Sequence, residues 1–577
     1  MRPVPVSARV VGDFVRGTEE PRGVVWFGAR SFWGHLRHLV SAAIASENID
    51  SRDWMTPDDP DVLRAHLLEL LGGDASRASV VEGLGRDLWI DFVADTGDDV
   101  SVSRAVARLV FASYELPDPD RPGQFLTAPR GDVLFFGGDT AYPVATAQEI
   151  LNRIVVPWNQ VLAALPDDGR RRVLLGIPGN HDWYDGLDGF ARMFRRRAGG
   201  GAARALMTAQ SPPLLVQSAL WAREFVRGGA VDKPDVLELA GYTPVQSASH
   251  FLLRLAPHID LLAADRQLTS IDRRQRLFFG AADQPRPGAA TLVVLPDPVH
   301  LFGDPSRTGV PMMESLELDP TARETFVLTG DIHHYERAAR GEALHVIAGG
   351  GGAFLHPARV APGGLPPTVT WPDVAQSRRL LRGVPWKLAC GRSGWLPHLC
   401  LLAIYWPAVA FDGRLLAWVS VNVWAVVVAT VVLGVVFALL GGAARRKSVL
   451  PLAVAGAAIA ATIPIGASWL VRGVLPYIDH RAFSIAVSLV TLAVAVFAGT
   501  LVFGAFLTLL TLFGYEHMQA LTALDHPGFK HFVRLRVRAD GRGIDAWCVG
   551  ATDPLRPDAQ PELVDHFVWR PFAGPSP

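Results

Sequence analysis

The stretches DVLFFGGDTAYP at 132–143 and VLLGIPGNHDWYDG at 173–186 decide the fold class. Each starts with a short apolar run and continues into glycines, which is the pattern of a buried strand that ends in a tight turn. Asp139, Asn180 and His181 follow the two runs directly. Because ligands bind beyond the carboxyl ends of strands in open α/β sheets, these polar residues predict a functional site.

The same pattern recurs twice more along the chain. LWIDFVADTGDD at 88–99 reaches Asp95 at the end of its apolar run, and FVLTGDIHHYER at 326–337 reaches Asp331 and His333. Carboxylate, amide and imidazole groups that four strands deliver to one sheet edge are groups that bind metal ions. The sequence therefore predicts an α/β fold with a metal site at its strand ends.

Five blocks hold most of these polar residues: VADTGD at 93–98, GGDTAYP at 137–143, IPGNHDWYDGL at 177–187, GDIHHY at 330–335 and GGGGAFLHP at 349–357. In these blocks the chain resembles the calcineurin-like metallophosphoesterases, and most closely the membrane-attached branch of that family. The resemblance covers about 86–360. It implies a catalytic domain built as a four-layer α/β sandwich that holds two divalent metal ions.

The resemblance implies that Asp95, Asp139 and His333 hold the first metal ion, with Asp139 bridging to the second. Two divalent ions stabilise the charge of a phosphoryl group and lower the pKa of bound water. The broad family has a histidine two residues after Asp95, where this chain has Gly97. Purple acid phosphatases share this DxG pattern and supply a tyrosine from GDxxY, which corresponds here to Tyr142. The alternatives are a helix cap for Asp95 and simple packing for Tyr142.

By the same resemblance, Asp139, Asn180 and Asp331 would hold the second metal ion. The family has a histidine at a further strand end, where TLVVLPDPVH has Pro296. Proline cannot bind a metal, so His300 is the candidate that is left, and without it the second site lacks a ligand. Carboxylates favour hard ions, so we expect Mn²⁺ first, with Fe, Zn or Mg as alternatives.

His181 is the candidate general acid, because a histidine pKa of about 6.5 suits proton donation to a leaving group. Asp182 either orients His181 or caps the next turn. His334 is either a contact to the ligands or substrate, or an exposed residue after its strand. The glycines at 349–352 either cradle a phosphate or form a tight turn under the site.

Composition limits the remaining functions. A chain of 577 residues is too long for one hydrophobic core and indicates two or three units. A net charge of −1 gives no argument for a nucleic-acid partner. Three cysteines without CxxC spacing disfavour disulfides and a zinc finger, and they fit a reducing compartment.

Long apolar runs predict a membrane region at 395–514. A bilayer core requires about 20 apolar residues. The runs that reach this length are 415–442, 449–471 and 482–514. A shorter run at 396–411 is either a fourth span or an interfacial segment. Basic residues at 445–447 and in the C-terminal tail favour four spans, with the catalytic domain and both basic segments in the cytoplasm.

The remaining segments have weaker patterns. We expect a helical extension at 1–85, in which 30–46 is amphipathic and either packs on the catalytic domain or lies on a membrane. Residues 361–394 form a linker. Residues 515–577 are predicted as a small strand-rich extension, in which a strand with one solvated face contains Arg534.

These features predict an integral, multi-pass cell-membrane phosphoesterase that hydrolyses a phosphomonoester or phosphodiester through a dinuclear metal centre. Its partners would be the lipid bilayer and a small phosphorylated or lipid-linked substrate. The alternative is a catalytically degenerate fold that acts as a membrane sensor or scaffold, which Pro296 favours. A transporter is disfavoured because the apolar runs contain few charges.

Overall fold

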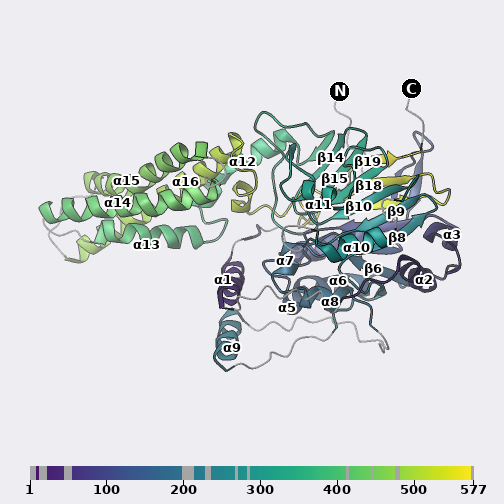
Figure 1. The fold of residues 1–577 in the computed structure, drawn as a ribbon. Coiled ribbons are helices and arrows are strands. Elements are labelled where there is room, and N and C mark those ends of the chain that lie inside the picture. The colour runs from purple at the N-terminus through teal and green to yellow at the C-terminus, as the bar shows by residue number, and fades with distance from the viewer. Residues whose placement is uncertain are drawn as a thin grey trace.

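The computed structural model describes residues 8–11, 14, 23–26, 28–44, 55–197, 213–227, 236–266, 271–282, 286–410, 415–442, 447–474 and 481–572. These residues form a mixed α/β body from which a bundle of apolar helices projects (Figure 1). The body contains two seven-stranded sheets. The prediction of an α/β class with an apolar helical region after it is therefore confirmed.

The first seven-stranded sheet has the order β19-β18-β17-β2-β5-β6-β7. Its strands are β2 (Leu88–Val93), β5 (Val133–Phe136), β6 (Arg172–Gly176), β7 (Tyr242–Pro244), β17 (Lys530–Val537), β18 (Ile544–Ala551) and β19 (Glu562–Trp569). The first four are parallel neighbours. Their apolar runs in β2, β5 and β6 are fully buried, as expected of strands covered on both faces.

The C-terminal strands complete this sheet, whereas the sequence indicated a separate small extension. β17 lies antiparallel to β2, with Val533 opposite Phe92. The expectation that Arg534 lies on a solvated face is wrong. This side chain is fully buried, and its guanidinium donates to the buried Asp91 carboxylate at 2.6 and 3.0 Å. The alternation of charged residues here reflects a buried ion pair.

The second seven-stranded sheet has the order β16-β14-β15-β13-β10-β9-β8. Its strands are β8 (Phe251–Ala256), β9 (Ile259–Ala263), β10 (Ala290–Leu295), β13 (Thr325–Thr329), β14 (Tyr335–Arg340), β15 (Ala343–Ala348) and β16 (Val369–Trp371). There are also two small sheets. One contains β1 (Arg9–Val10), β3 (Tyr114–Pro117) and β4 (Phe125–Ala128), and the other contains β11 (His300–Leu301) and β12 (Asp304–Pro305). In the second sheet β9, β10, β13 and β15 are parallel, so their carboxyl ends share one edge.

One apolar core joins the inner faces of the two large sheets. The rings of Phe135 and Phe251, one from each sheet, have centroids 5.8 Å apart. Helices cover the outer faces and pack there in two further apolar clusters. These helices are α4 (Val100–Phe111), α5 (Ala147–Ile150), α6 (Val156–Ala163) and α8 (Asp188–Phe194) on the first sheet, and α10 (Arg273–Ala281) and α11 (Gly309–Ser315) on the second.

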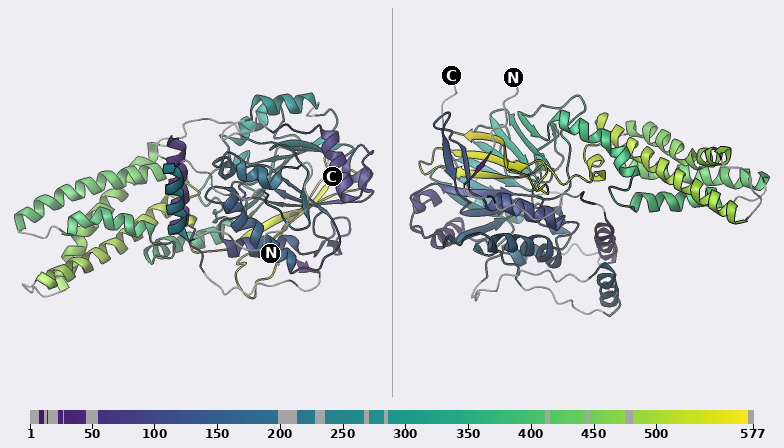
Figure 2. Two further views of the ribbon diagram at one scale, coloured as in Figure 1. Left: turned by 90° about the horizontal axis from the view of Figure 1, so that it is seen from below. Right: turned by 180° about the vertical axis from the view of Figure 1, so that it is seen from behind.

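The N-terminal region contains α1 (Ala29–Ile44), α2 (Pro60–Leu71) and α3 (Val80–Leu84). The start and stop signals of α2 were readable in the sequence. Asp59 accepts a hydrogen bond from the Asp61 amide at the helix start, and Gly72 ends the helix with φ 74°. Helix α9 (Leu214–Arg227) lies beside α1 (Figure 2).

The apolar region consists of α13 (Leu396–Ala410), α14 (Leu415–Leu440), α15 (Leu450–Val474) and α16 (Arg481–Leu512), preceded by α12 (Val374–Ala389). Two segments, Lys447–Val471 and Ile485–Leu512, are long and apolar enough to cross a membrane, and Leu396–Pro407 and Trp424–Leu440 are shorter apolar helices. Consecutive helices of this region run antiparallel to one another (Figure 1). The segment that sequence reasoning left as a span or an interfacial segment is thus a helix of this bundle.

Contacts between helices show which ends of the bundle adjoin the body. Phe437, near the end of α14, stacks on Phe506 near the end of α16, with centroids 4.3 Å apart. A Cβ on Gly504 would lie 2.6 Å from Cα of Pro385 in α12, which leads out of the body. Lys447 follows α14 and is therefore at the body end, whereas Arg445 and Arg446 lie outside the described residues.

Candidate metal centre

Three aspartates occupy strained backbone positions just beyond strand ends. Asp95 follows β2, Asp139 follows β5 and Asp331 follows β13, and their φ angles are 58°, 50° and 67°. This left-handed region is uncommon for residues other than glycine, although aspartate tolerates it better than most. Such strain concentrates at functional sites, where the surrounding structure holds it in place. These turns direct polar groups of both sheets toward one place.

The hydroxyl of Tyr142 lies where three buried candidate ligands meet. Its oxygen is 2.9 Å from Asp95 Oδ1, 3.2 Å from Asp139 Oδ2 and 3.0 Å from His333 Nε2. His333 Nε2 is also 3.3 Å from Asp95 Oδ1. The structure therefore brings together all four residues that the sequence assigned to the first metal ion.

The turn after β2 explains why a glycine stands at position 97. Its φ is 57°, and a Cβ there would lie 2.6 Å from the Thr140 carbonyl oxygen. The Gly97 carbonyl accepts a hydrogen bond from the Tyr142 amide at 3.0 Å. A histidine would be strained at this position, and Tyr142 supplies the group that reaches Asp95. The alternative for Tyr142 was that it only packs beside its neighbours. Packing alone does not account for the polar contacts of its hydroxyl group with Asp95, Asp139 and His333. Asp99, not Asp95, caps α4, because its carboxylate accepts from the Ser101 amide at 2.9 Å.

Across the described part of the chain, no group of three or more His, Cys, Asp or Glu side chains is spaced as ligands of one ion. The chemistry of the cluster nevertheless fits a cation. Burial raises the pKa of Asp95 to about 8 and that of Asp139 to about 7, and burial with nearby acids raises that of Asp331 well above its usual range. Ionised carboxylates in such a place require positive charge beside them. Carboxylate oxygen, phenol oxygen and imidazole nitrogen together suit Mn²⁺, Fe or Zn.

Lys530 is a nearby cation that sequence reasoning treated only as part of a basic tail. It begins β17, is fully buried, and its ammonium donates to the Ala353 carbonyl. Burial lowers its pKa to about 7, while attraction to Asp98 and Asp95 opposes this shift. The C-terminal segment thus contributes directly to the electrostatics of the site.

The candidate ligands of the second ion lie on the open side of the cluster. Asp331 donates its amide to Asp95 Oδ2 at 2.9 Å, and both Asp331 and Asn180 are half-buried. Asn180 donates its side-chain amide to the Tyr184 hydroxyl at 3.0 Å. The carbonyl oxygen of Asn180 is therefore the atom that could bind a cation.

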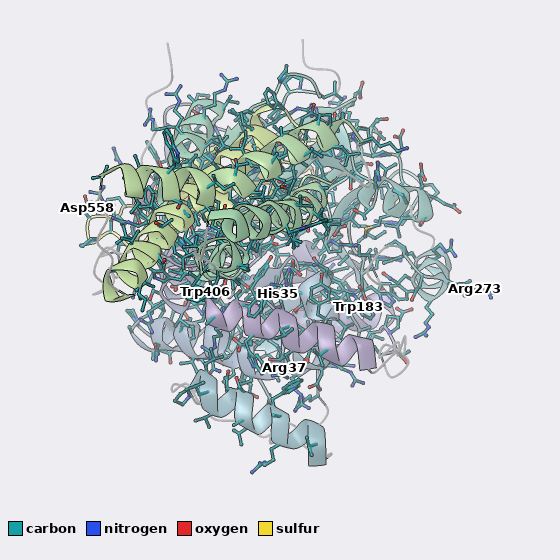
Figure 3. All side chains as sticks on the ribbon, turned by 90° about the vertical axis from the view of Figure 1, so that its left-hand side faces the viewer. His35, Arg37, Trp183, Arg273, Trp406 and Asp558 are labelled. Carbon is teal, nitrogen blue, oxygen red and sulfur yellow. The ribbon has the colours of Figure 1, made fainter. Side chains whose placement is uncertain are left out.

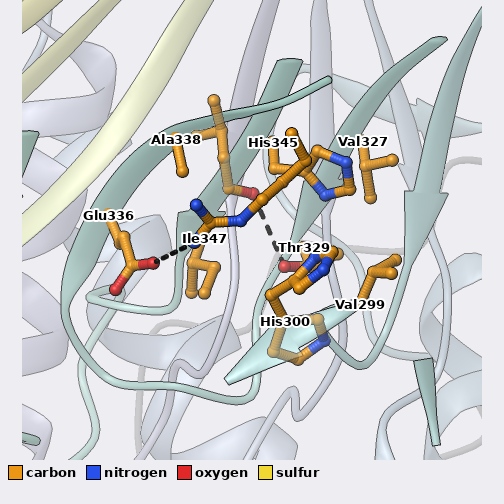
Figure 4. A pocket seen from close by; sticks show the side chains of 11 residues that line it. Val299, His300, Val327, Thr329, Glu336, Ala338, His345 and Ile347 are labelled. Atoms are coloured by element: carbon orange, nitrogen blue, oxygen red, sulfur yellow. Dashed lines mark hydrogen bonds and ion pairs between the residues drawn. The ribbon is translucent and has the colours of Figure 1, made fainter. Parts of the chain in front are cut away.

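His300 lies in a separate small pocket, between β13, β14 and β15 (Figure 4). Its ring centroid is 5.3 Å from that of His345, and Glu336 and Arg340 line the same pocket. Burial lowers the pKa of His300. This position gives no support to His300 as a ligand beside Asp139.

Asp297 is the acidic residue at this edge that sequence reasoning missed. The register pairs the ends of β10 and β13, and Asp297 and Asp331 each follow two residues later. Asp297 is buried, forms an ion pair of 2.6 Å with the buried Arg266, and is close enough to Asp331 to raise its pKa. The signal was available, because Asp297 directly follows Pro296 at a strand end.

His181, at the start of α7 (Asn180–Trp183), is held by the Asp139 carboxylate and the Pro143 carbonyl. Its amide donates to Asp139 Oδ1 at 2.8 Å, and its ring Nδ1 is 2.6 Å from the Pro143 carbonyl oxygen. The ring centroid is 4.2 Å from that of Tyr142. If Nδ1 donates to the carbonyl, Nε2 is the nitrogen that exchanges a proton with a ligand.

Asp182 caps α7 and does not orient the His181 ring. Its carboxylate accepts from the Gly179 amide at 2.9 Å and from the Thr140 amide at 3.3 Å. Of the two roles left open for Asp182, the geometry supports the cap. The acid that contacts His181 is Asp139, through the backbone.

The glycine-rich segment after β15 packs closely beneath the site. The Gly351 amide donates to the Ala94 carbonyl at 2.9 Å, and a Cβ on Gly349 would lie 2.6 Å from Asp95 Oδ2. This supports the tight-turn interpretation of the segment. His334 is fully buried, with Nδ1 3.0 Å from the Pro357 carbonyl oxygen, so its interpretation as an exposed residue is wrong.

No model of a known protein family matches the chain, and no curated protein matches it. Among solved structures, 13 chains match. One is GAP50, described as the anchor in the inner membrane complex of Plasmodium, with 11% identity, a TM-score of 0.27 and coverage of 50% of this chain and 77% of that one. Another is PhoD, with 11% identity, a TM-score of 0.25 and coverage of 47% of this chain and 58% of that one. Similarities of this size give no argument about function.

Proposed function

We propose that this chain is an integral membrane phosphoesterase that hydrolyses a phosphomonoester or phosphodiester with two divalent metal ions. The observation that supports it most is the convergence of Asp95, Asp139 and His333 on the Tyr142 hydroxyl, beside His181. Divalent ions bound there would neutralise phosphoryl charge and activate water. Asp331 and Asn180 would complete the second site, and Mn²⁺ is the first ion to test.

The protein's own groups position the general acid. Asp139 accepts the His181 amide and the Pro143 carbonyl faces its Nδ1, so the ring has one orientation. Nε2 of His181 would pass a proton to the leaving oxygen as the ester bond breaks. The ring of Tyr142 lies tilted against that of His181, and its hydroxyl lies within hydrogen-bond distance of both Asp95 and Asp139, to one of which it donates its single proton.

The test is hydrolysis by the full chain in detergent after addition of Mn²⁺, Fe²⁺, Zn²⁺ or Mg²⁺. The substrates are p-nitrophenyl phosphate for a monoesterase and bis(p-nitrophenyl) phosphate for a diesterase. We expect metal-dependent turnover that Asp139→Asn abolishes. Turnover that continues unchanged in a chelator, or in Asp139→Asn, would refute the proposal.

A catalytically degenerate sensor or scaffold is the second candidate. Pro296 replaces the expected histidine, and His300 lies in its own pocket. A degenerate centre would bind one ion without turnover of either substrate. Metal analysis alongside the assay therefore distinguishes it from the enzyme.

We further propose a multi-pass cell-membrane location with the α/β body in the cytoplasm. Two helices are apolar and long enough to span, and two shorter apolar helices pack with them. Lys447 stands at the body end of the bundle, where a positive charge favours the cytoplasmic side.

A further inference from the structure

Helices α1 and α9 lie side by side at the junction between the α/β body and the apolar bundle (Figure 2). The rings of Trp33 and Trp221 connect them edge-on, with centroids 5.4 Å apart. Seen along the bundle toward the body, both helices run across the view (Figure 3). They therefore lie along the surface of any bilayer that the bundle spans.

Helix α9 exposes an apolar stripe that no described element covers. Leu215 is 84% exposed and Val226 is 81% exposed. Ala219 and Ala222 are also exposed and lie between them at the spacing of one helix face. Leaving such a stripe in water is unfavourable, so it indicates a binding surface.

Helix α1, the neighbour of α9, also has exposed apolar and basic groups. Phe32 and Leu36 are exposed one turn apart, and Arg37 is exposed beside them. Arg223 is exposed on α9. An apolar face together with positive charge is typical of helices that lie in the headgroup zone of a membrane.

The bundle has exposed aromatic residues at this same level. Trp386 near the end of α12 and Trp395 just before α13 are 62% and 65% exposed. Lys387 and Arg392, next to them in the chain, form ion pairs with Asp525. Tryptophans mark the boundary between lipid and water, so the bilayer surface would pass through the junction where α1 and α9 lie.

Helix α1 also contacts the candidate metal centre. A Cβ on Gly34 would lie 2.4 Å from Pro143, so the helix backbone packs directly against that loop. The His35 ring centroid is 6.5 Å from that of His181. His181 is half-buried, as are Asn180 and Asp331, and it is the member of this open side that lies beside α1.

The geometry points to a membrane-surface platform made of α1 and α9, which presents the phosphoester of a bilayer lipid to His181. This inference rests on the proposed phosphoesterase function and names its substrate class, a phosphate ester whose alcohol is a membrane-anchored lipid. Water adds to phosphorus, the P–O bond to the lipid alcohol breaks, and a proton from His181 passes to that alcohol oxygen. The lipid chains stay in the bilayer throughout.

The first test measures the depth of the platform in phosphatidylcholine nanodiscs that contain the full chain. Cys390 and Cys400, which are exposed, are replaced by serine, and a fluorophore is attached at Leu215→Cys or Val226→Cys. We expect quenching by brominated acyl chains at both positions. Leu277→Cys on α10, 61% exposed and on a helix at the flank of the body, is the matched control and should not be quenched (Figure 3).

The second test compares a lipid substrate with a soluble one. We expect Leu215→Asp with Val226→Asp to lower the turnover of phosphatidic acid or a polyprenyl phosphate in nanodiscs by about tenfold or more, because two apolar anchors are lost. Turnover of p-nitrophenyl phosphate should stay within about twofold, since the metal centre is untouched. Leu277→Asp should change neither rate.

The outcomes separate this inference from the proposed function. Absence of quenching at 215 and 226 would overturn the platform, whatever the activity. Hydrolysis of p-nitrophenyl phosphate but of neither lipid phosphate, or equal losses on soluble and lipid substrates in the aspartate variant, would overturn the substrate class. Quenching without any hydrolysis would refute the phosphoesterase and leave the platform as a membrane-docking surface.

Discussion

Asp139 links the candidate metal centre to the candidate general acid. One carboxylate oxygen accepts the Tyr142 hydroxyl and the other accepts the His181 amide, at 3.2 and 2.8 Å. A Cβ on Gly179 would lie 2.1 Å from Asp139 Oδ1, so the neighbouring turn leaves no room for movement. A change at Asp139 therefore affects both metal binding and the placement of His181.

We predict that Asp139→Asn removes the bound metal and abolishes turnover while the fold persists. Asparagine keeps the shape but loses the negative charge that would bridge two cations. Metal content by mass spectrometry and activity with added Mn²⁺ provide the measurement. Asp132→Asn is the matched control, because Asp132 is buried at the opposite end of β5 and pairs with Arg86. It should lower stability but keep the metal; equal metal loss in both variants would contradict the assignment.

His181 permits a prediction that depends on the leaving group. His181→Ala should lower turnover by about 10²–10⁴-fold for poor leaving groups, the usual contribution of a general acid. Activated p-nitrophenyl esters should be affected much less, because their leaving oxygen departs without a proton. Metal content should stay near that of the unchanged protein. Equal losses for alkyl and nitrophenyl esters would rule out the proton-transfer role.

At the scale of residues, the sequence predicted the strand-end groups better than their contacts. Asp95, Asp139 and His333 were proposed because each follows a buried strand, and Tyr142 was proposed from the resemblance to the combined DxG and GDxxY pattern. Asp297 was missed because its position near Asp331 depends on the register of β10 and β13. A local sequence pattern does not show which strands pair. Lys530 was missed for a similar reason, since it reaches the site from a strand more than four hundred residues after Asp95 along the chain.

At the scale of elements, the pairing of β17 with β2 determines how the body is built. Arg534 on β17 and Asp91 on β2 are both fully buried, and the guanidinium also donates to the carbonyls of Val110, Ala112 and Ala128. A buried charge is tolerated only when its hydrogen bonds are satisfied in this way. The pair therefore specifies which strand β17 joins and in what register.

We predict that Arg534→Met destabilises the body by about 3–5 kcal/mol, because Asp91 would be left buried without its partner. Chemical unfolding of the full chain in detergent, followed by tryptophan fluorescence, measures the change. Arg534→Met combined with Asp91→Leu should recover part of the loss, since no unpaired charge is left. Arg556→Met, in an exposed pair with Asp558, should change stability little. A similarly small effect for Arg534→Met would show that the pair is not important for the sheet.

The element scale also shows where sequence patterns stop being informative. Apolar runs predicted β2, β5, β6 and the bundle helices, because their periodicity and length are local properties. The alternating arginines of β17 suggested a solvated face, because a lone strand with charges is most often exposed. Arg534 is buried because β17 pairs with β2. In the chain, β2 precedes the apolar region and β17 follows it, so no local pattern shows this pairing.

At the scale of the whole molecule, the first sheet constrains the topology in a membrane. β2 precedes the bundle in the chain and β17 follows it, yet the two strands are hydrogen-bonded neighbours. If the bundle spans a bilayer as proposed, both strands lie on one side of it, which requires an even number of crossings. The sequence has three long apolar runs. Three spans would place β2 and β17 on opposite sides of the bilayer. The two helices that are long and apolar enough to span satisfy this condition, and so do the four crossings that we propose, in which the short α13 would be one.

We predict that Glu342→Cys in the body and Gln560→Cys between β18 and β19 are labelled from the same side, and Val474→Cys at the end of α15 from the other. All three positions are exposed, and Val474 lies at the end of the bundle away from the body. The measurement is labelling by a membrane-impermeant maleimide in intact cells and in opened vesicles, with Cys390 and Cys400 replaced by serine. With the proposed orientation, in which Lys447 at the body end of the bundle faces the cytoplasm, only Val474→Cys should react in intact cells. Labelling of positions 342 and 560 from opposite sides would be incompatible with the β2–β17 pairing. Labelling of all three positions from one side would show that the bundle does not cross the membrane.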